Sequence, residues 1–279
     1  MKKRSLEDFF YAKRALVDKA LDKYLPTEGK LSQAMRYSVF AGGKRLRPIL
    51  CLAAGEMLGI SEKKVLPFAC SLELVHTFTL IHDDLPSMDN SDLRRGKPAC
   101  HKVYGEGVAI LAGDALNTLA FNIIAYHPRP LKYLSQALNE VIEGQVEDIE
   151  STKKNLTVKD LEKIHAWKTA ALLRACLQGT ALMKRISDKK YKALGDYALH
   201  LGLAFQIADD ILDATSTESE LGKPVSSDVC KGFPHLIGIE RSIELANDEK
   251  NKALSVLGVF GSEAGLLREI AEYVIERQK

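Results

Sequence analysis

Residues 73–89 read ELVHTFTLIHDDLPSMD, an apolar stretch that ends in acidic side chains. Apolar residues recur in it with a period near 3.6, which predicts a helix as far as Ile81. Pro86 disfavours helical geometry at the residue before it, so we expect the chain to turn there and fold Asp89 back toward Asp83. The stretch therefore predicts an apolar helix that delivers adjacent carboxylates to a turn.

The same period runs through most of the chain. Ser61 and Thr157 precede acidic residues and are expected to cap their helices, and no alternating strand pattern competes. These patterns predict an all-α fold, a single-domain bundle of about ten or more helices over residues 1–279. The expected helices are Leu6–Tyr24, Leu31–Phe40, Pro48–Leu58, Ser61–Ile81, Val108–Ala125, Pro130–Ile149, Val158–Lys184 and Asp188–Leu212, with two more after Phe233.

Composition excludes several classes of protein. The 279 residues include 39 basic and 37 acidic side chains, a formal charge of +2, and no basic tract is long enough to follow a nucleic-acid backbone. No run of eighteen apolar residues occurs, so we expect neither a membrane span nor secretion. The cysteines lack CxxC spacing and indicate a reducing cytoplasm without a disulfide framework or a zinc site; they are Cys51, Cys70, Cys100, Cys176 and Cys230.

A second acidic stretch, QIADDILD, occupies residues 206–213. On a helix, Gln206, Asp209 and Asp213 share one face, and Asp210 lies about 100° round from Asp209. Adjacent carboxylates ~5 Å apart repel by roughly 3 kcal/mol at an effective dielectric of ~20, so a positive group should compensate them. One acidic pair alone is equally consistent with a solvated helix face. Two acidic pairs on apolar helices favour a Mg²⁺ site, because Mg²⁺ prefers oxygen ligands from carboxylates and substrate phosphates.

Basic residues cluster in three places that could hold a phosphate: GKRLRP at residues 43–48, LRRGKP at residues 93–98, and Lys168 beside Thr169. Arginine offers a planar fork to phosphate oxygens, and Gly42 with Gly43 lets the backbone approach an anion closely. Within these clusters, Arg45 and Lys97 are well explained as ordinary surface charge.

Several single residues are weaker candidates. His76 falls seven residues before Asp83 on nearly the same helical face, although a lone helical histidine is more often a packing or surface group. Gln145 and Asp148 lie on one predicted helix with a similar ambiguity. Trp167, the only tryptophan, is expected to pack.

Taken together, the motifs resemble the trans-prenyltransferase family, the polyprenyl diphosphate synthases, and most closely the bacterial-type farnesyl diphosphate synthases. GGKRLRP, ELVHTFTLIHDDLPSMDNSDLRRGKP, LAGDAL, EGQVED, WKTAAL and FQIADDILD follow the family's order and approximate spacing over roughly residues 31–224. The resemblance implies a helical bundle around a central cavity between the two aspartate motifs, usually a homodimer. It also implies isopentenyl diphosphate and an allylic diphosphate as substrates, with about three Mg²⁺ ions per site.

The resemblance assigns roles position by position. It implies Mg²⁺ binding, directly or through water, by Asp83, Asp84, Asp89, Asp209, Asp210 and Asp213. It implies that Arg94, Lys168 and Lys223 bind the allylic diphosphate and that Lys44, Arg47, His76 and Arg95 bind isopentenyl diphosphate. Thr169 and Gln206 lie where the family places oxygens near the developing allylic cation.

Two further features concern the length of the product and the C-terminal part of the chain. Phe78, five residues before Asp83 and followed by Thr79, would block a growing chain and favours farnesyl diphosphate, although geranylgeranyl synthases share the four residues between Asp84 and Asp89. The stretch Asp228–Pro234 lacks the family's Thr-Tyr pair and puts closure over the site in doubt. A terpene cyclase would not need a second diphosphate site, so GGKRLRP and the Arg94–Arg95 pair disfavour it. A non-catalytic regulatory subunit is a further alternative.

Overall fold

The computed structural model describes residues 5–151, 156–215 and 232–276, with the side chains of 275 and 276 left aside. These residues are helical apart from loops and one short hairpin, which confirms the all-α prediction. Lys223, one of the predicted site residues, lies outside the described residues. The chain divides into two compact units, Met1–Leu131 and Lys132–Lys279. That the chain forms a single domain remains a prediction.

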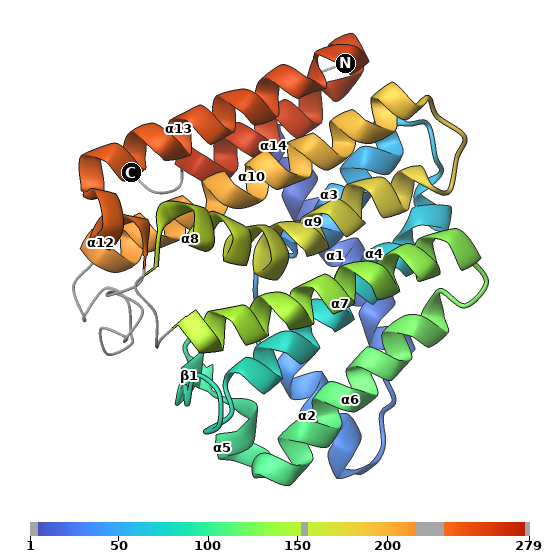
Figure 1. Ribbon diagram of the computed structural model, residues 1–279. Coiled ribbons are helices and arrows are strands. Elements are labelled where there is room, and N and C mark those ends of the chain that lie inside the picture. The colour runs from blue at the N-terminus through green and yellow to red at the C-terminus, as the bar shows by residue number, and fades with distance from the viewer. Residues whose placement is uncertain (1–4, 152–155, 216–231, 277–279) are drawn as a thin grey trace. The chain divides into compact units, whose positions relative to one another are not determined.

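The first unit is organised around one buried helix, α4 (Glu62–Asp83), which packs against α3 (Leu46–Met57) and α6 (Glu106–Ile123). Residues 68–75 of α4 are all buried. Among the described residues α4 is also the one helix long and apolar enough to cross a membrane, but 67% of its apolar window is buried, as in a core helix. Three further helices complete this unit (Figure 1): α1 (Leu6–Tyr24), α2 (Gly29–Val39) and α5 (Cys100–Tyr104).

A two-residue hairpin follows α4. Strands β1 (Leu93–Arg94) and β2 (Lys97–Pro98) pair antiparallel, with Arg95 at φ 54° and Gly96 at φ 73° in the turn between them. Positive φ at both central residues is typical of the tight turns that match strand twist. The sequence predicted no helix between Ile81 and Val108, so α5 is a correction, and the hairpin is a feature that the sequence did not specify. Both are too short for a periodic pattern to appear.

The second unit is built around the long helix α10 (Asp188–Thr215), which packs along α13 (Ile239–Val256) and also contacts α14 (Gly265–Glu276) (Figure 1). The fully buried Tyr197 on α10 donates a hydrogen bond to the carbonyl of Leu267 at 2.7 Å. The remaining helical segments are α7 (Pro128–Ser151), which begins at the boundary, α8 (Val158–His165), η1 (Ala166–Ala170), α9 (Ala171–Arg174), η2 (Ala175–Gly179), α12 (Phe233–Ile237) and η4 (Leu257–Ala264).

The segment predicted as one helix over Val158–Lys184 is instead interrupted by two π-helical turns, η1 and η2. Its start is as predicted, because Thr157 and Asp160 form a reciprocal capping box. A Cβ on Gly144 of α7 would lie 2.6 Å from the backbone nitrogen of Lys168, so glycine allows α7 to lie against η1. Wider turns of this kind occur often at functional sites, and η1 carries Lys168 and Thr169.

Helix boundaries elsewhere agree with the predictions to within a few residues. Ser61 occupies the N-cap position of α4, although its hydroxyl makes no capping hydrogen bond. Helix α2 ends at Val39, and Gly42 and Gly43 follow at φ 111° and 110°. These two positive φ angles let the chain reverse before α3 begins, where a residue with a Cβ would be strained.

Candidate functional site

The first acidic station is the turn that follows α4, with Asp83, Asp84 and Asp89. The amide of Asp89 donates to the carbonyl of Asp83 at 2.8 Å, and the amide of Ser91 donates to the carbonyl of Asp84 at 3.2 Å. The chain therefore folds back after Pro86, as the sequence predicted. This turn brings the backbone of Asp89 next to that of Asp83.

A cation compensates this station. The Nε of Arg94 donates to both oxygens of Asp84, at 2.9 and 3.2 Å, and its Nη2 contacts the same carboxylate. Burial alone would lower the pKa of Arg94, but the hydrogen bond and charge of Asp84, with the charges of Asp83 and Asp89, raise it. The positive group that carboxylate repulsion required is thus Arg94, carried by β1.

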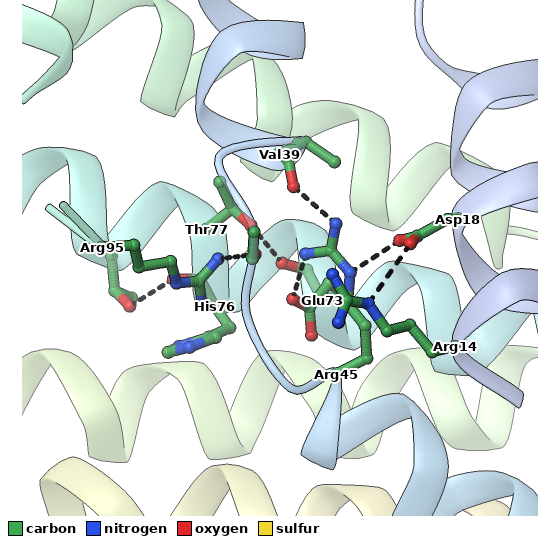
Figure 2. Close-up of polar contacts among 10 residues, drawn as sticks. Arg14, Asp18, Val39, Arg45, Glu73, His76, Thr77 and Arg95 are labelled. Carbon is green, nitrogen blue, oxygen red and sulfur yellow. Dashed lines mark hydrogen bonds and ion pairs between the residues drawn. The ribbon is translucent and has the colours of Figure 1, made fainter. Parts of the chain in front are cut away.

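A second group of cations surrounds the loop between α2 and α3. Arg95 donates through Nη1 to the carbonyl of Gly42, and a Cβ on Gly43 would lie 2.6 Å from the Cζ of Arg95. Figure 2 shows the Arg95 guanidinium near the ring of His76, on α4. Hairpin and helix α4 therefore bring together Arg95 and His76, two of the residues that the resemblance assigns to isopentenyl diphosphate.

These cations change one another's proton affinity. Burial, followed by the charges of Arg47, Arg95, Arg94 and Arg45, holds the pKa of His76 well below its usual range. Burial also lowers the pKa of Arg95; Glu73 opposes this, and the neighbouring arginines reinforce it. A set of cations that repel one another is a favourable place for a polyanion.

Arg45 corrects a prediction. The sequence indicated ordinary surface charge at this position, but the Arg45 side chain is buried, with a relative exposure of 3% for the residue. It contacts carboxylates on α1 and α4, which are distant in sequence and could not be identified from local pattern. Lys97, given the same interpretation, is exposed as expected.

The second acidic station lies on α10. Gln206 donates through Nε2 to Oδ1 of Asp210 at 3.2 Å, and the hydroxyl of Thr169 donates to Oε1 of Gln206 at 3.1 Å. The backbone amide of Phe233 donates to Oδ2 of Asp210 at 3.1 Å. Asp210, which the helical pattern had set apart from the main face, is thus the carboxylate that these donors orient.

Lys168 stands beside this station and pairs with Asp148 at 2.6 Å. Both residues line a cavity of about 110 Å³, whose other walls include His165, Gln206, Asp210 and Asp213. The prediction grouped Lys168 with Thr169 and named Asp148 only as a weaker candidate. The Nε2 of Gln145, the other weak candidate, is buried and has no hydrogen-bond partner among the described residues.

His165 and Phe233 lie beside the second station, and the sequence interpretation did not name them as candidates. Their rings stack with centroids 5.7 Å apart, and Nε2 of His165 lies 3.7 Å from Oδ2 of Asp210. The described residues offer no hydrogen-bond partner to either ring nitrogen of His165, which is buried. The spacing of three between His165 and Lys168 was a usable signal, because such residues share a helix face. Trp167 instead meets the ammonium of Lys163, 4.5 Å from its ring centroid.

Phe78, the predicted floor for the product, is buried on α4 with 8% exposure. Its ring meets His82 edge to face, with centroids 5.4 Å apart, and Nε2 of His82 lies 3.1 Å from the carbonyl of Ile110 on α6. Phe78 is therefore held by packing within the first unit.

Over the described ranges, no three His, Cys, Asp or Glu side chains gather closely enough to hold a metal by themselves. The two stations nevertheless consist of carboxylate oxygens, the donor type that suits Mg²⁺. Any ion held here would need further ligands from water or from a bound molecule. Such shared coordination is usual for Mg²⁺.

Comparison with known proteins identifies the family. The Polyprenyl synthetase family model matches residues 28–274. The chain is 45% identical to a farnesyl diphosphate synthase of Geobacillus stearothermophilus over 82% of each chain. It is 42% identical to the heterodimeric geranylgeranyl pyrophosphate synthase large subunit 1 of Arabidopsis thaliana, over 97% of this chain and 79% of that one. A solved structure, the geranylgeranyl pyrophosphate synthetase of Pyrococcus horikoshii, matches with a TM-score of 0.87 at 30% identity, covering 97% of this chain and 99% of that chain.

Proposed function

The chain belongs to the polyprenyl synthetase family, and we propose that it joins isopentenyl diphosphate head to tail to dimethylallyl or geranyl diphosphate, with farnesyl diphosphate as its product. The observation that carries the proposal is that each acidic station lies beside a cation of its own unit. Arg94 binds Asp84 at the first station, and Lys168 lines one cavity with Asp210 at the second. Carboxylates beside cations suit a diphosphate that arrives with Mg²⁺.

Mg²⁺ fits both stations because its preferred ligands are carboxylate, water and phosphate oxygens. Bound there, it would neutralise the charge that builds on the departing diphosphate. The residues that would hold it are Asp83, Asp84, Asp89, Asp209, Asp210 and Asp213.

The cations of the second unit would bind the allylic substrate. Lys168 and Lys223 would bind the allylic diphosphate, as would Arg94, and stabilise its growing negative charge when the C–O bond breaks. The oxygens of Thr169 and Gln206 would face the allylic cation that remains. Because Thr169 donates its proton to Gln206, its lone pairs stay available to a positive charge.

The cations around the loop between α2 and α3 would bind the second substrate. Lys44, Arg47 and Arg95 would bind the diphosphate of isopentenyl diphosphate, and the neutral ring of His76 would donate one hydrogen bond to it. The double bond of this substrate then attacks the cation, and the proton released goes to the diphosphate that has left. Apolar walls would keep water from capturing the cation first.

The product assignment rests on Phe78. A buried aromatic ring on α4, five residues before Asp83, would stop a chain that grows along this helix. Geranylgeranyl diphosphate is a specific second candidate, because relatives of similar identity carry that name, including the Arabidopsis thaliana large subunit. Replacing the ring with a smaller side chain should lengthen the product if Phe78 is the floor.

The proposal is tested by incubating the purified chain with isopentenyl diphosphate and geranyl diphosphate, with and without Mg²⁺, and separating the products by length. We expect Mg²⁺-dependent farnesyl diphosphate from the wild type, a longer product from Phe78→Ala, and none from Asp209→Ala. A wild-type product of geranylgeranyl length would retain the chemistry and overturn the assigned floor. A folded wild-type chain that produces no condensation would overturn the proposal and indicate a regulatory subunit.

The same preparation tests the proposed assembly. We propose a homodimer, and light scattering after size-exclusion chromatography should give twice the 30.8 kDa chain mass. A monomer that becomes active only with a second protein would contradict it. The cytoplasmic location expected from the sequence remains a prediction.

A further inference from the structure

Arg45 is a cation inside a proposed diphosphate-binding loop, yet each of its three guanidinium nitrogens already donates to a protein oxygen. Nε donates to Oδ1 of Asp18 at 2.8 Å, Nη1 to Oε1 of Glu73 at 2.8 Å, and Nη2 to the carbonyl of Val39 at 2.6 Å (Figure 2). Glu73 is buried as deeply as Arg45, with 1% exposure. Arg45 is therefore buried with each guanidinium nitrogen already donating to a protein oxygen, so we assign it no substrate contact. We name these residues the Asp18–Arg45–Glu73 triad.

The triad holds an unfavourable backbone conformation. Arg45 has φ 53° and ψ 35°, the left-handed region, and it is the N-cap of α3. A non-glycine residue is strained in this region, so tertiary contacts must hold it there. Its ion pairs with α1 and α4 are those contacts. They determine where α3 begins, and therefore where Lys44 and Arg47 stand on either side.

The other end of the loop is held by a different cation. Arg95 donates to the carbonyl of Gly42 and fills the space that a side chain on Gly43 would need. In the part of the chain that the structure describes, the Arg95 guanidinium makes no ion pair with a carboxylate. Two arginines thus hold one loop from opposite ends, one neutralised by two acids and the other still available to an anion.

Helix α4 connects the triad to the rest of the cluster. Glu73 lies three residues before His76, so the two side chains leave neighbouring turns of one helix. The hydroxyl of Thr77 donates to the carbonyl of Glu73 at 2.8 Å within that turn. A change at Glu73 would therefore release the loop without removing any group that we assign to substrate.

We propose that the Asp18–Arg45–Glu73 triad is a positioning network, which presets Lys44, Arg47 and Arg95 around the diphosphate of isopentenyl diphosphate. The identity of that ligand rests on the proposed function. A buried ion network of this kind adds little net stability over apolar residues of equal size, so its use here is better explained by the geometry it imposes.

Steady-state kinetics of matched variants test the network. Glu73→Gln should raise the KM for isopentenyl diphosphate about tenfold, with the KM for geranyl diphosphate within about twofold of wild type. Asp18→Asn should act in the same direction by about threefold, because the Asp18 side chain is 32% exposed. Asp22→Asn is the control, since Asp22 lies one turn further along α1 and pairs with Arg36 at the surface, and it should leave both constants unchanged.

A double variant separates positioning from folding. Arg45→Met with Glu73→Leu removes both buried charges and keeps apolar volume, so thermal unfolding should stay within a few degrees of wild type. The KM for isopentenyl diphosphate should nevertheless stay raised, because nothing then holds the left-handed residue. A double variant with the wild-type KM would overturn the inference, as would Glu73→Gln with unchanged kinetics.

Binding of inorganic diphosphate without Mg²⁺, followed by calorimetry, keeps this test independent of turnover. Weaker binding by Glu73→Gln than by wild type and Asp22→Asn would support the triad, even if the wild type condensed nothing. Equal binding by all three would overturn it. Failure of the proposed function would instead appear as an inactive wild type, whatever the variants bind.

Discussion

The two acidic stations stabilise their buried or half-buried carboxylates with different kinds of partner. At the first, Asp84 has 2% exposure and takes its charge compensation from a guanidinium, through contacts of Arg94 with both oxygens. At the second, Asp210 is oriented by the amide of Gln206 and the backbone amide of Phe233, and His165 stands 3.7 Å away. Removing the cation from a buried carboxylate lowers the stability of the fold strongly. A carboxylate that accepts hydrogen bonds from neutral donors costs less stability when one of these donors is changed. The stations should therefore differ in how mutation affects them.

Arg94→Met should distinguish the two stations most clearly. It leaves Asp84 buried without its cation, which should lower the free energy of unfolding by about 3 kcal/mol. It should also lower kcat/KM by about 10³-fold, because a proposed diphosphate contact is lost. Denaturant unfolding and steady-state kinetics measure the two effects.

Arg36→Met is the matched control, because Arg36 pairs with an exposed carboxylate on Asp22. Arg36→Met should lower the free energy of unfolding by about 1 kcal/mol or less and leave kcat/KM unchanged. Arg94→Lys should recover only part of the loss, since an ammonium cannot copy the guanidinium fork. Equal unfolding free energies for Arg94→Met and wild type would show that Asp84 does not depend on this cation.

At the second station, Asp210→Asn should separate activity from stability. Asparagine keeps one acceptor for its neutral donors, so the free energy of unfolding should fall by about 1 kcal/mol at most. Activity should fall by about 10²-fold, because the proposed Mg²⁺ ligand loses its charge. Asp196→Asn, on the same helix and paired with Lys192 at the surface, should change neither. A stability loss at Asp210 as large as that at Arg94 would remove the contrast between the stations.

The smallest expected effect concerns pH. Burial and the surrounding arginines hold the pKa of His76 well below its usual range. In the unfolded chain His76 binds a proton near pH 6.5, whereas in the folded chain it does so only at lower pH. Protonation therefore favours the unfolded chain below about pH 6.5, and the free energy of unfolding falls as the pH drops below that value. Between pH 7 and 5, the unfolding midpoint of wild type should fall a few degrees further than that of His76→Gln. Parallel curves would show that His76 titrates normally.

Local sequence determined much of this protein. The 3.6-residue period located the long helices because burial of one face repeats along a helix, and α1 spans the predicted Leu6–Tyr24. The capping box at Thr157 and the fold-back after Pro86 were also predictable, because their partners lie within a few residues. The motif order was sufficient to indicate the family.

Tertiary structure decided what local pattern could not. Arg45 was predicted to be surface charge and is buried, because its partner Glu73 lies on another helix. The choice of Arg94 for Asp84 depends on a hairpin too short to leave a periodic signal. The stacking of His165 on Phe233 beside Asp210 likewise joins three separate helices. Residue identity and spacing determine which chemical groups are present, whereas the solvent that each group loses and the partner it gains depend on contacts between segments far apart in the chain.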